Sequence, residues 1–431
     1  MTEIRVGLLG FGTIGAGMVK CIAENAEIMA GRTGVRLRVA GIADLDISTD
    51  RGVPVDSSLL TTDALSVIDS PDIDVIVELI GGTTIAKDFV LRALRSGKAV
   101  VTANKALLAY HGEEIFSTAR EHGVDVYYEA SVGGGIPIIK SLREGLSANR
   151  FEAIYGILNG TCNYILTRME NEGILFDDVL REAQELGYAE AEPSLDIDGD
   201  DTAHKTCVLA SLAFGKWFSM SDIDKEGIRG IALEDIHNAG EAGYRIKVLG
   251  IIKNSNGQIE MRVHPTLVPS RSMLGSVDGV FNAVCVNGDY VGPTMFYGRG
   301  AGRDATASAV VADLVDVGLN ISHGAKNRVP GFQPHASDLA LAAPEDVCCR
   351  YYLRLMAIDH PDVLAKITHA LGATGINIAS IHQKESDEET VPVIVITDIA
   401  REGDITKALA EVAALGVTQG SPVRLRIEDL T

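Results

Sequence analysis

The chain has 431 residues, of which 46% are hydrophobic and 23% are charged. This composition provides enough apolar surface for about two to four ordinary domains and argues against a disordered chain or a fibre. Acidic residues outnumber basic residues 59 to 38, and the net charge of −21 would repel a phosphate backbone or an anionic membrane, so neither nucleic acid nor a membrane is expected as a partner.

The first part of the chain alternates short apolar runs with helix-length amphipathic segments, which is the pattern of repeated βαβ units in a parallel sheet. We therefore predict an α/β fold with a doubly wound Rossmann sheet over residues 1–132. Its strands are expected at 4–9, 37–42, 75–80, 99–102 and 124–128, and its helices at 14–29, 85–96 and 107–122.

A second domain, of the α+β class, is expected over residues 133–321. Its alternating polar and apolar segments are typical of an antiparallel sheet. The expected elements are helical stretches at 163–187 and 201–214, separated by a segment rich in Asp, Glu and Pro at 190–200, and strands at 259–268 and 280–286.

Residues 322–349 contain three prolines and no clear periodicity, so we expect a linker there. The remaining residues, 350–431, are predicted to form a third domain of the βαββαβ type. Its strands are expected at 351–358, 377–383, 391–396 and 423–427, and its helices at 363–373 and 405–415.

A glycine-rich turn closes the first expected strand and opens the first expected helix. Residues 10–15 read Gly-Phe-Gly-Thr-Ile-Gly and fit the pattern G-x-G-x-x-G. Gly10 permits the tight turn, Gly12 lets the backbone approach a pyrophosphate, and Gly15 lets the helix pack on the strand. The helix N-terminus then faces the anion. The turn therefore predicts a dinucleotide site, with a plain strand-to-helix turn as the alternative.

The sequence leaves the choice between NAD and NADP open. Asp44 follows the second expected strand and would favour NAD by binding a ribose 2′-hydroxyl, although it lies 29 positions after Gly15 where about 20 is usual. Arg38 and Arg51 are placed to meet the 2′-phosphate of NADP instead.

Two further loops, residues 81–83 and 102–105, are expected at the carboxyl edge of the same sheet, where a dinucleotide binds. Lys105 would face this crevice directly after a buried strand. Its charge would meet an unfavourable helix dipole there, which favours a functional role over that of an ordinary solvated lysine.

The densest polar cluster lies between residues 187 and 205. Asp201 and Lys205 are spaced i, i+4, so they share one face of an expected helix that is mostly apolar. A partly desolvated lysine held by a carboxylate can donate a proton to the oxyanion that forms when a carbonyl carbon accepts hydride. The alternative is a surface ion pair worth about a few tenths of a kcal/mol. His204 lies about 100° away around the helix and is expected outside this site.

Cysteine usage and the absence of targeting segments indicate the compartment. Six cysteines without CxxC spacing predict reduced, mostly buried thiols. No run of about 18 apolar residues and no signal-peptide core is found, so a cytoplasmic protein is expected.

With these segments in place, the whole chain resembles the homoserine dehydrogenase family, in the bacterial form that carries a C-terminal ACT domain. The resemblance spans all three expected domains. It rests on GFGTIG at 10–15, TANK at 102–105, EASVGGGIP at 129–137, NGTCNYIL at 159–166, GYAEAEP at 187–193, DDTAHK at 200–205 and GRGAGRDATASAVVADL at 298–314.

The resemblance implies reversible, NAD(P)-dependent interconversion of L-aspartate 4-semialdehyde and L-homoserine, a step toward threonine, methionine and isoleucine. It implies that Lys205 is the proton donor, that Lys105 lies between cofactor and substrate, and that Asp201 orients the substrate hydroxyl region. Glu190 would bind the substrate near its amino group, and Asp196 would be a further polar substrate contact.

Other binding residues of the family also match this sequence. One carboxylate and backbone carbonyls would bind a monovalent cation, usually sodium, at Glu129, Val132, Gly134 and Ile136. The cofactor would contact Gly10, Phe11, Gly12, Thr13, Ile14, Gly15, Asp44, Lys105, Gly187, Glu190 and Gly302. The middle domain would be catalytic and would form a dimer or a higher homo-oligomer.

Two positions depart from the family pattern. Asp200 stands where an apolar residue is common. Asp362 follows the proline of the ACT loop, where a glycine usually lies close to an amino-acid effector, so weak inhibition by threonine, or none, is expected.

Two other functions compete with this interpretation. A non-catalytic amino-acid sensor would keep the nucleotide fold and the ACT module but would have no use for Lys205 as a desolvated donor. A related amino-acid dehydrogenase with another substrate would keep the glycine loop and vary the acidic segment.

Overall fold

The computed structural model describes residues 1–255, 257–325, 328–335, 339–383 and 389–430. These residues separate into two compact units, which are described one at a time. Unit 1 contains Met1–Gly160, Asp201–Ile223 and Val280–Leu339, and unit 2 contains Thr161–Asp200, Asp224–Gly279 and Ala340–Thr431.

The domain ranges expected from the sequence, 1–132, 133–321, 322–349 and 350–431, stay predictions. The two compact units have other bounds than these domains. Each unit combines stretches that are separate in the sequence. Part of the expected linker, at 326–327 and 336–338, lies outside the described residues.

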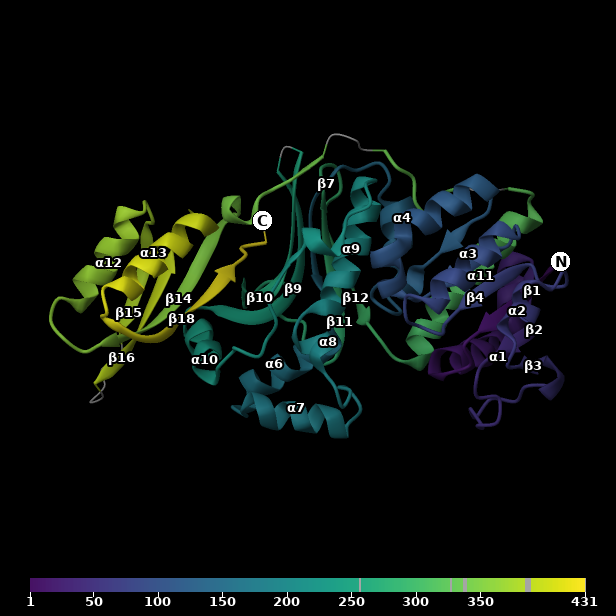
Figure 1. The fold of residues 1–431 in the computed structure, drawn as a ribbon, viewed down its shortest axis with the longest axis horizontal. Coiled ribbons are helices and arrows are strands. Elements are labelled where there is room, and N and C mark those ends of the chain that lie inside the picture. Colours follow the sequence, from purple (N-terminus) through teal and green to yellow (C-terminus); the bar gives the residue numbers. More distant parts are fainter. Residues whose placement is uncertain (256, 326–327, 336–338, 384–388, 431) are drawn as a thin grey trace. The chain divides into compact units, whose positions relative to one another are not determined.

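A parallel sheet forms the centre of unit 1 (Figure 1). Its strand order, β3-β2-β1-β4-β5-β6, confirms the predicted doubly wound sheet. The strands are β1 (Thr2–Leu9), β2 (Val35–Ala43), β3 (Leu60–Thr61), β4 (Val75–Glu78), β5 (Ala99–Thr102) and β6 (Val126–Tyr127). The two-residue β3 was not predicted, since so short a strand has no periodicity to detect.

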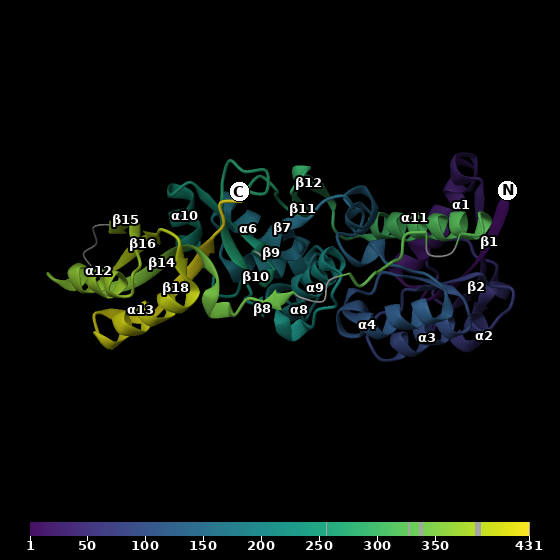
Figure 2. The same ribbon diagram turned by 90° about the horizontal axis from the view of Figure 1, so that it is seen from above.

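Helices cover both faces of this sheet. Figure 2 shows α1 and α11 on one face and the other three helices on the opposite face. The helices are α1 (Thr13–Thr33), α2 (Ala64–Ile68), α3 (Ile85–Arg95), α4 (Lys105–His122) and α11 (Arg303–Ser322). Left-handed glycines end α1 and α4, at Gly34 (φ +72°) and Gly123 (φ +64°), where only glycine avoids a steric penalty.

Helix α11 completes the apolar core of unit 1 from far along the chain. Its inward side chains pack with those of α1, β1 and β2. Among the described residues, α11 is long and apolar enough to cross a membrane, but more than half of its most apolar window is buried within the structure. Such burial is typical of a core helix.

The rest of unit 1 contains an antiparallel group of three strands, of which the sequence analysis expected only the one at 280–286. Strand β11 lies between β7 and β12. The elements are η2 (Glu129–Ser131), α5 (Ile138–Lys140), η3 (Ser141–Gly145), β7 (Phe151–Ile157), α9 (Asp200–Phe214), η4 (Met220–Asp222), β11 (Phe281–Gly288) and β12 (Gly292–Arg299).

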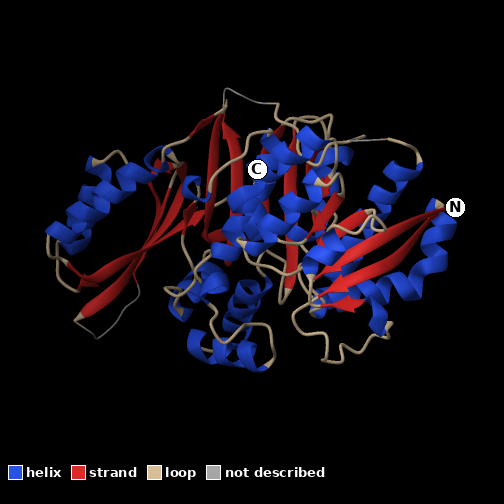
Figure 3. Cartoon of the chain, turned by 45° about the vertical axis from the view of Figure 1, so that its right-hand side comes forward, coloured by secondary structure: helices blue, strands red, loops and turns tan. Residues whose placement is uncertain are grey.

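Unit 2 contains one long sheet with the order β9-β10-β18-β14-β16-β15. Figure 3 shows helices on one face of its C-terminal strands, where α12 and α13 complete a βαββαβ fold. The strands are β8 (Asp224–Lys225), β9 (Tyr244–Ser255), β10 (Gln258–Pro269), β13 (Ala340–Leu341), β14 (Cys348–Ile358), β15 (Ile378–Gln383), β16 (Thr390–Thr397), β17 (Ala400–Arg401) and β18 (Thr418–Ile427).

The helices of unit 2 differ from the prediction, which did not include those at Ser194–Ile197 and Leu233–Glu241. The stretch expected to be helical at 163–187 is two helices, because Gly173 adopts a left-handed conformation (φ +66°) between them. The helices are α6 (Gly160–Glu172), α7 (Phe176–Glu185), α8 (Ser194–Ile197), α10 (Leu233–Glu241), α12 (Val363–Ala373) and α13 (Glu402–Ala414), with η5 at Pro344–Asp346.

A buried charge network joins β18 to β10, which pair in parallel. Arg262 donates to Glu428 at 2.9 Å, and the two side chains are only 3% and 4% exposed. Arg426 donates to Glu402 of α13 at 2.8 Å. Removing either partner of such a pair leaves an uncompensated buried charge, which costs about 3–5 kcal/mol. The C-terminal strands and the β9–β10 hairpin therefore share one interior.

His264 lies within this network and is fully buried in β10. Arg262 approaches its Nε2 atom at 3.1 Å, and since a guanidinium has only donors, Nε2 accepts. The proton of the neutral ring is therefore on Nδ1, which lies 3.1 Å from the Pro265 carbonyl oxygen.

Replacing His264 with glutamine is expected to reduce the loss of stability in acid. Burial, together with the charges of Arg426 and Arg262, holds the pKa of His264 well below its ordinary value. The unfolded chain binds a proton below pH about 6.5 that the folded chain does not, so the unfolding free energy falls as the pH falls. Urea unfolding at about pH 7 and pH 5 should show a loss about 2 kcal/mol smaller for His264→Gln than for the wild type. Equal losses would contradict this assignment.

Candidate active site

A carboxylate that joins two lysines forms the strongest candidate site in unit 1. The Nζ atom of Lys205 lies 2.7 Å from Oδ2 of Asp201, and the Nζ atom of Lys105 lies 3.1 Å from Oδ1. The i, i+4 pairing predicted for Asp201 and Lys205 is confirmed. The structure adds Lys105, which reaches the same carboxylate from another element.

Burial sets the electrostatics of this cluster. The side chains of Asp201 and Lys205 are 6% and 10% exposed, and that of Lys105 is 33% exposed. Burial alone would raise the pKa of the Asp201 carboxyl, but the charges of Lys205 and Lys105 outweigh it and hold that pKa well below its usual range. The carboxylate therefore stays ionised at neutral pH.

Two elements place the lysines. Lys105 is the first residue of α4, directly after β5, and Asn104 caps that helix by accepting a hydrogen bond from the Leu107 N–H at 3.0 Å. Lys205 lies one turn into α9, which is buried along most of its length. His204 packs edge-on against Tyr110, with 5.4 Å between ring centroids, and does not share the face of Asp201 and Lys205.

Two groups that the sequence analysis did not single out complete the cluster. The side-chain amide of Asn159 donates to Oδ2 of Asp201 at 2.9 Å, and the Leu158 carbonyl accepts from Lys205 at 2.6 Å. An Asn-Gly pair directly after a buried strand is the available signal, because such a pair places a polar amide at a strand end.

The glycine loop has the geometry that its pattern predicts. Gly10 is left-handed (φ +97°), and a Cβ on Gly15 would lie 2.2 Å from the Gly10 carbonyl oxygen, so both glycines are required by the packing of helix on strand. A Cβ on Gly12 would meet nothing within 4 Å. Gly12 therefore borders open space at the start of α1, which fits a pyrophosphate.

The carboxylate of Asp44 lies against this loop. Its Oδ2 accepts from the Phe11 N–H at 2.5 Å, and its Oδ1 accepts from the Asp46 N–H at 2.8 Å. Arg51 pairs with Asp46 at 3.1 Å, and its buried Nε has no hydrogen-bond partner among the described residues. Arg38 is paired with Glu3 at 2.9 Å.

Two glycines expected near the cofactor, Gly302 and Gly187, border open space in the structure. Gly302 (φ +111°) caps α11, whose start lies against α1, since a Cβ on Gly17 would be 2.7 Å from Arg303 Cγ. In unit 2, Gly187 (φ +74°) follows α7. A Cβ at either expected position would meet nothing within 4 Å.

The predicted substrate carboxylates lie in unit 2. Asp196 is half-buried in α8, and its Oδ2 accepts from the Thr161 hydroxyl at 3.2 Å. Glu190 is exposed, and its carbonyl accepts from the Gln184 side chain at 3.0 Å. The neighbouring Asp200, where the family commonly has an apolar residue, forms an ion pair with Lys225.

The loop expected to bind a cation is buried around Glu129. Each oxygen of the Glu129 carboxylate accepts a backbone N–H at 2.8 Å, from Ile139 and Lys140. Burial raises the pKa of Glu129 to about 7. Both carboxylate oxygens are therefore taken up by backbone amides, and the Ile136 carbonyl accepts from the Ile138 N–H at 2.8 Å. Among the described residues, no group of three or more His, Cys, Asp or Glu side chains could hold a metal.

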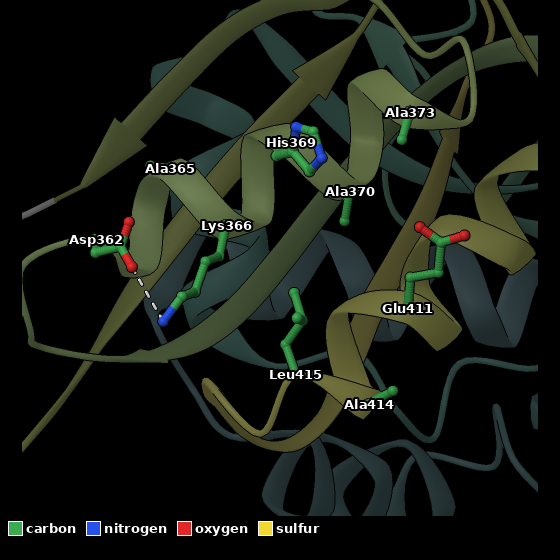
Figure 4. A pocket seen from close by; sticks show the side chains of 9 residues that line it. All are labelled: Asp362, Ala365, Lys366, His369, Ala370, Ala373, Glu411, Ala414 and Leu415. Atoms are coloured by element: carbon green, nitrogen blue, oxygen red, sulfur yellow. Dashed lines mark ion pairs between the residues drawn. The ribbon is translucent and has the colours of Figure 1, made fainter.

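A hollow of about 640 Å³ lies between α12 and α13 in the C-terminal fold. Asp362 and Lys366 form an ion pair at one end, with 3.1 Å between Nζ and Oδ2, and Glu411 lies at the other end (Figure 4). Asp362 is left-handed (φ +81°), so the position where the family usually has glycine does have a backbone conformation that favours glycine.

Replacing Asp362 with alanine is expected to lower the unfolding free energy by about 1 kcal/mol, because alanine tolerates the left-handed conformation less well than aspartate. Both alanine and glycine lose the exposed ion pair with Lys366, which is worth about a few tenths of a kcal/mol. Glycine at the same position should stay within about 0.5 kcal/mol of the wild type, since relief of strain and the greater entropy of the unfolded chain offset each other. Urea unfolding of both variants measures the difference. Equal losses for alanine and glycine would contradict the strain argument.

A glycine turn that borders open space at a helix start, together with two lysines on one buried carboxylate, is typical of NAD(P)-dependent oxidoreductases. The family comparisons define the protein further. A model described as "Homoserine dehydrogenase, NAD binding domain" matches residues 10–129, "Homoserine dehydrogenase" matches 137–315, and "ACT domain" matches 351–414. The chain belongs to the homoserine dehydrogenase family, as expected from its motifs.

Relatives match over the full length of the chain or over about three quarters of it. The homoserine dehydrogenase of Pseudomonas aeruginosa is 48% identical over 437 residues, covering 100% of both chains. The crystal structure of a homoserine dehydrogenase from Thiobacillus denitrificans has a TM-score of 0.95 and 47% identity, covering 100% of this chain and 99% of that one. A hyperthermophilic archaeal homoserine dehydrogenase in complex with NADPH has a TM-score of 0.64 and 26% identity, covering 74% of this chain and 98% of that one. The chain is thus an NAD(P)-dependent oxidoreductase that acts on a CH–OH group.

Proposed function

We propose that this enzyme interconverts L-aspartate 4-semialdehyde and L-homoserine with Lys205 as the proton donor. The observation that supports this best is the Asp201 carboxylate, which holds the ammonium groups of Lys205 and Lys105 at 2.7 Å and 3.1 Å. A lysine without a catalytic role would gain little stability from burial at this position. A proton donor, in contrast, must be kept charged and held in a fixed position.

When bound, the nicotinamide supplies hydride to C4 of the semialdehyde and accepts it back from homoserine. The substrate oxygen gains negative charge as its carbon gains hydride, and it needs a proton. Two of the three N–H groups of Lys205 bond Asp201 and the Leu158 carbonyl, and the third is the one we assign to the substrate oxygen. The charge of Lys105 stabilises the same oxyanion.

In the reverse direction, Lys205 takes the hydroxyl proton of homoserine. Asp201 holds the lysine in both directions, and the amide of Asn159 fixes the carboxylate in turn. The substrate ammonium is assigned to Glu190 and a further polar group of the substrate to Asp196. Both side chains are carboxylates, which form strong charge-assisted hydrogen bonds with the ammonium group of an amino acid.

The cofactor is assigned to the glycine loop, residues 10–15, together with Asp44, Lys105, Gly187, Glu190 and Gly302. The open space at Gly12 supports the pyrophosphate position. Arg51, whose buried Nε has no hydrogen-bond partner among the described residues, supports recognition of a 2′-phosphate, and the position of Asp44 against the glycine loop supports recognition of a 2′-hydroxyl. A monovalent cation, usually sodium in this family, is assigned to the loop of Glu129, Val132, Gly134 and Ile136.

The proposed setting is the cytoplasmic synthesis of threonine, methionine and isoleucine. We assign a dimer or higher homo-oligomer to the middle domain and an amino-acid effector to the ACT domain. Asp362 supports weak inhibition by threonine or none, because its carboxylate stands where an effector would approach the backbone.

The test is an assay of the purified chain with L-aspartate 4-semialdehyde and with L-homoserine, each with both cofactors and with and without threonine. We expect NAD(P)H oxidation with the semialdehyde and NAD(P)⁺ reduction with homoserine. Turnover of another hydroxy amino acid, but not homoserine, would favour a related dehydrogenase. Binding of amino acids without turnover would favour a sensor.

A further inference from the structure

Glu78 is a fully buried carboxylate at the carboxyl end of β4. The structure gives it no ion-pair partner among the described residues. Its Oε1 accepts from the N–H groups of Ile80 and Gly81, at 2.9 and 3.1 Å, and its Oε2 accepts from the Thr102 hydroxyl at 2.7 Å. Burial raises the pKa of Glu78, and these hydrogen bonds oppose that effect. Burying a carboxylate without a cation costs free energy, so we expect Glu78 to have a role that offsets this cost.

The first partners of Glu78 belong to the loop between β4 and α3. This loop contains two left-handed glycines, Gly81 (φ +77°) and Gly82 (φ +72°), so it has few internal constraints of its own. It also contacts the glycine loop, since a Cβ on Gly10 would lie 2.6 Å from the Leu79 carbonyl. Glu78 thus fixes the backbone beside the pyrophosphate turn.

The other partner of Glu78 belongs to the loop between β5 and α4. Thr102 pairs with Glu78 across the two strands, and its hydroxyl accepts from the Asn104 N–H at 3.0 Å. The Asn104 side chain donates to the Gly82 carbonyl at 2.7 Å and caps α4. Lys105 follows Asn104 directly and reaches Asp201. A continuous series of hydrogen bonds therefore connects Glu78 to the lysine that the proposed reaction uses.

We propose that Glu78 is a positioning residue that joins these two loops and so holds Lys105 at the substrate oxygen. This inference rests on the proposed function. Glu78 itself touches neither Lys105 nor Asp201 and acts through Thr102 and Asn104. A displacement of about 1 Å in a positioned group can cost about 100-fold in rate, so a loop anchor of this kind affects turnover without contacting substrate.

The experiment compares Glu78→Gln, Thr102→Val and the double variant, with Thr102→Ser as the matched control. Glutamine keeps an acceptor for the two backbone N–H groups but replaces the oxygen that accepts from Thr102. Valine removes the Thr102 hydroxyl, and serine keeps it. Because both single variants break the same connection, the double variant should be no slower than the slower single variant.

We expect both single variants to lower kcat at least about tenfold at saturating homoserine and NADP⁺. NADPH affinity, measured by fluorescence titration, should change less than kcat. The Thr102→Ser variant should keep kcat within about twofold of the wild-type value. Variants with lower thermal stability but unchanged kcat would show a structural role and overturn the proposal, as would additive losses in the double variant. A wild type that does not turn over homoserine contradicts the proposed function, whereas an active wild type with unaffected variants contradicts only the role of Glu78.

Discussion

Replacing Lys205 with alanine is expected to lower kcat by about 10² to 10⁴-fold, the usual loss for a general acid, with a smaller effect on NADPH affinity. The alanine variant leaves Asp201 with Lys105 alone, so the substrate oxyanion loses its donor while one positive charge remains. Steady-state kinetics at saturating substrate and a fluorescence titration with NADPH separate the two effects.

Lys98 provides the control for this experiment. It is a second lysine of low exposure in unit 1, and its Nζ donates to the carbonyls of Ile68 and Ser70, the latter at 2.6 Å. It precedes β5, at the opposite edge of the sheet from Lys105. Lys98→Ala should lower thermal stability and keep kcat. A Lys205→Ala variant with nearly wild-type kcat would leave Lys205 as a structural partner of Asp201 and make Lys105 the first candidate for the donor.

Replacing Gly12 with valine is expected to abolish NADPH binding, a loss of at least about 100-fold in affinity, while the thermal transition stays nearly unchanged. The side chain would enter space that contains no protein atom within 4 Å of the new Cβ, so it meets the pyrophosphate and not the fold. Fluorescence titration with NADPH measures the affinity, and thermal unfolding tests the fold.

Gly31→Val is the matched control, since Gly31 lies near the other end of α1 and its added Cβ also meets nothing within 4 Å. That variant should bind NADPH as the wild type does. Gly15→Ala should instead lower stability, because its Cβ would overlap the Gly10 carbonyl. Unchanged NADPH affinity in Gly12→Val would place the cofactor elsewhere.

Local patterns predicted many of the regular elements, but not all of them. The strands at 75–80 and 99–102 and the helix at 363–373 were found within two residues of their expected bounds, because continuous apolar runs and helical spacing are visible in short windows. Elements that were not predicted include β3 and α2, whose two and five residues are too few for a period to repeat, and also longer ones such as β9 and α11, which have 12 and 20 residues.

The candidate site was predicted where its residues are close in sequence. The spacing of Asp201 and Lys205 predicted their contact, and the structure confirms it. The arrival of Lys105 at the same carboxylate depends on how β5 and α9 lie within unit 1, which no local pattern encodes. Glu78 was missed for the same reason, since a single acid at a strand end gives no sign of whether it will be buried.

The pairing of β18 with β10 has a consequence for how the chain is made. Thr266 and Arg426 are neighbours in the sheet but are synthesised far apart in time, and contacts between residues so distant in sequence form late. Until β18 leaves the ribosome, Thr266 and Leu267 of β10 lack their partner strand and Arg262 has no Glu428. Unpaired strand edges of this kind bind to one another. We expect a chain interrupted before β18 to expose these two residues and Arg262, and therefore to aggregate more readily than the full chain.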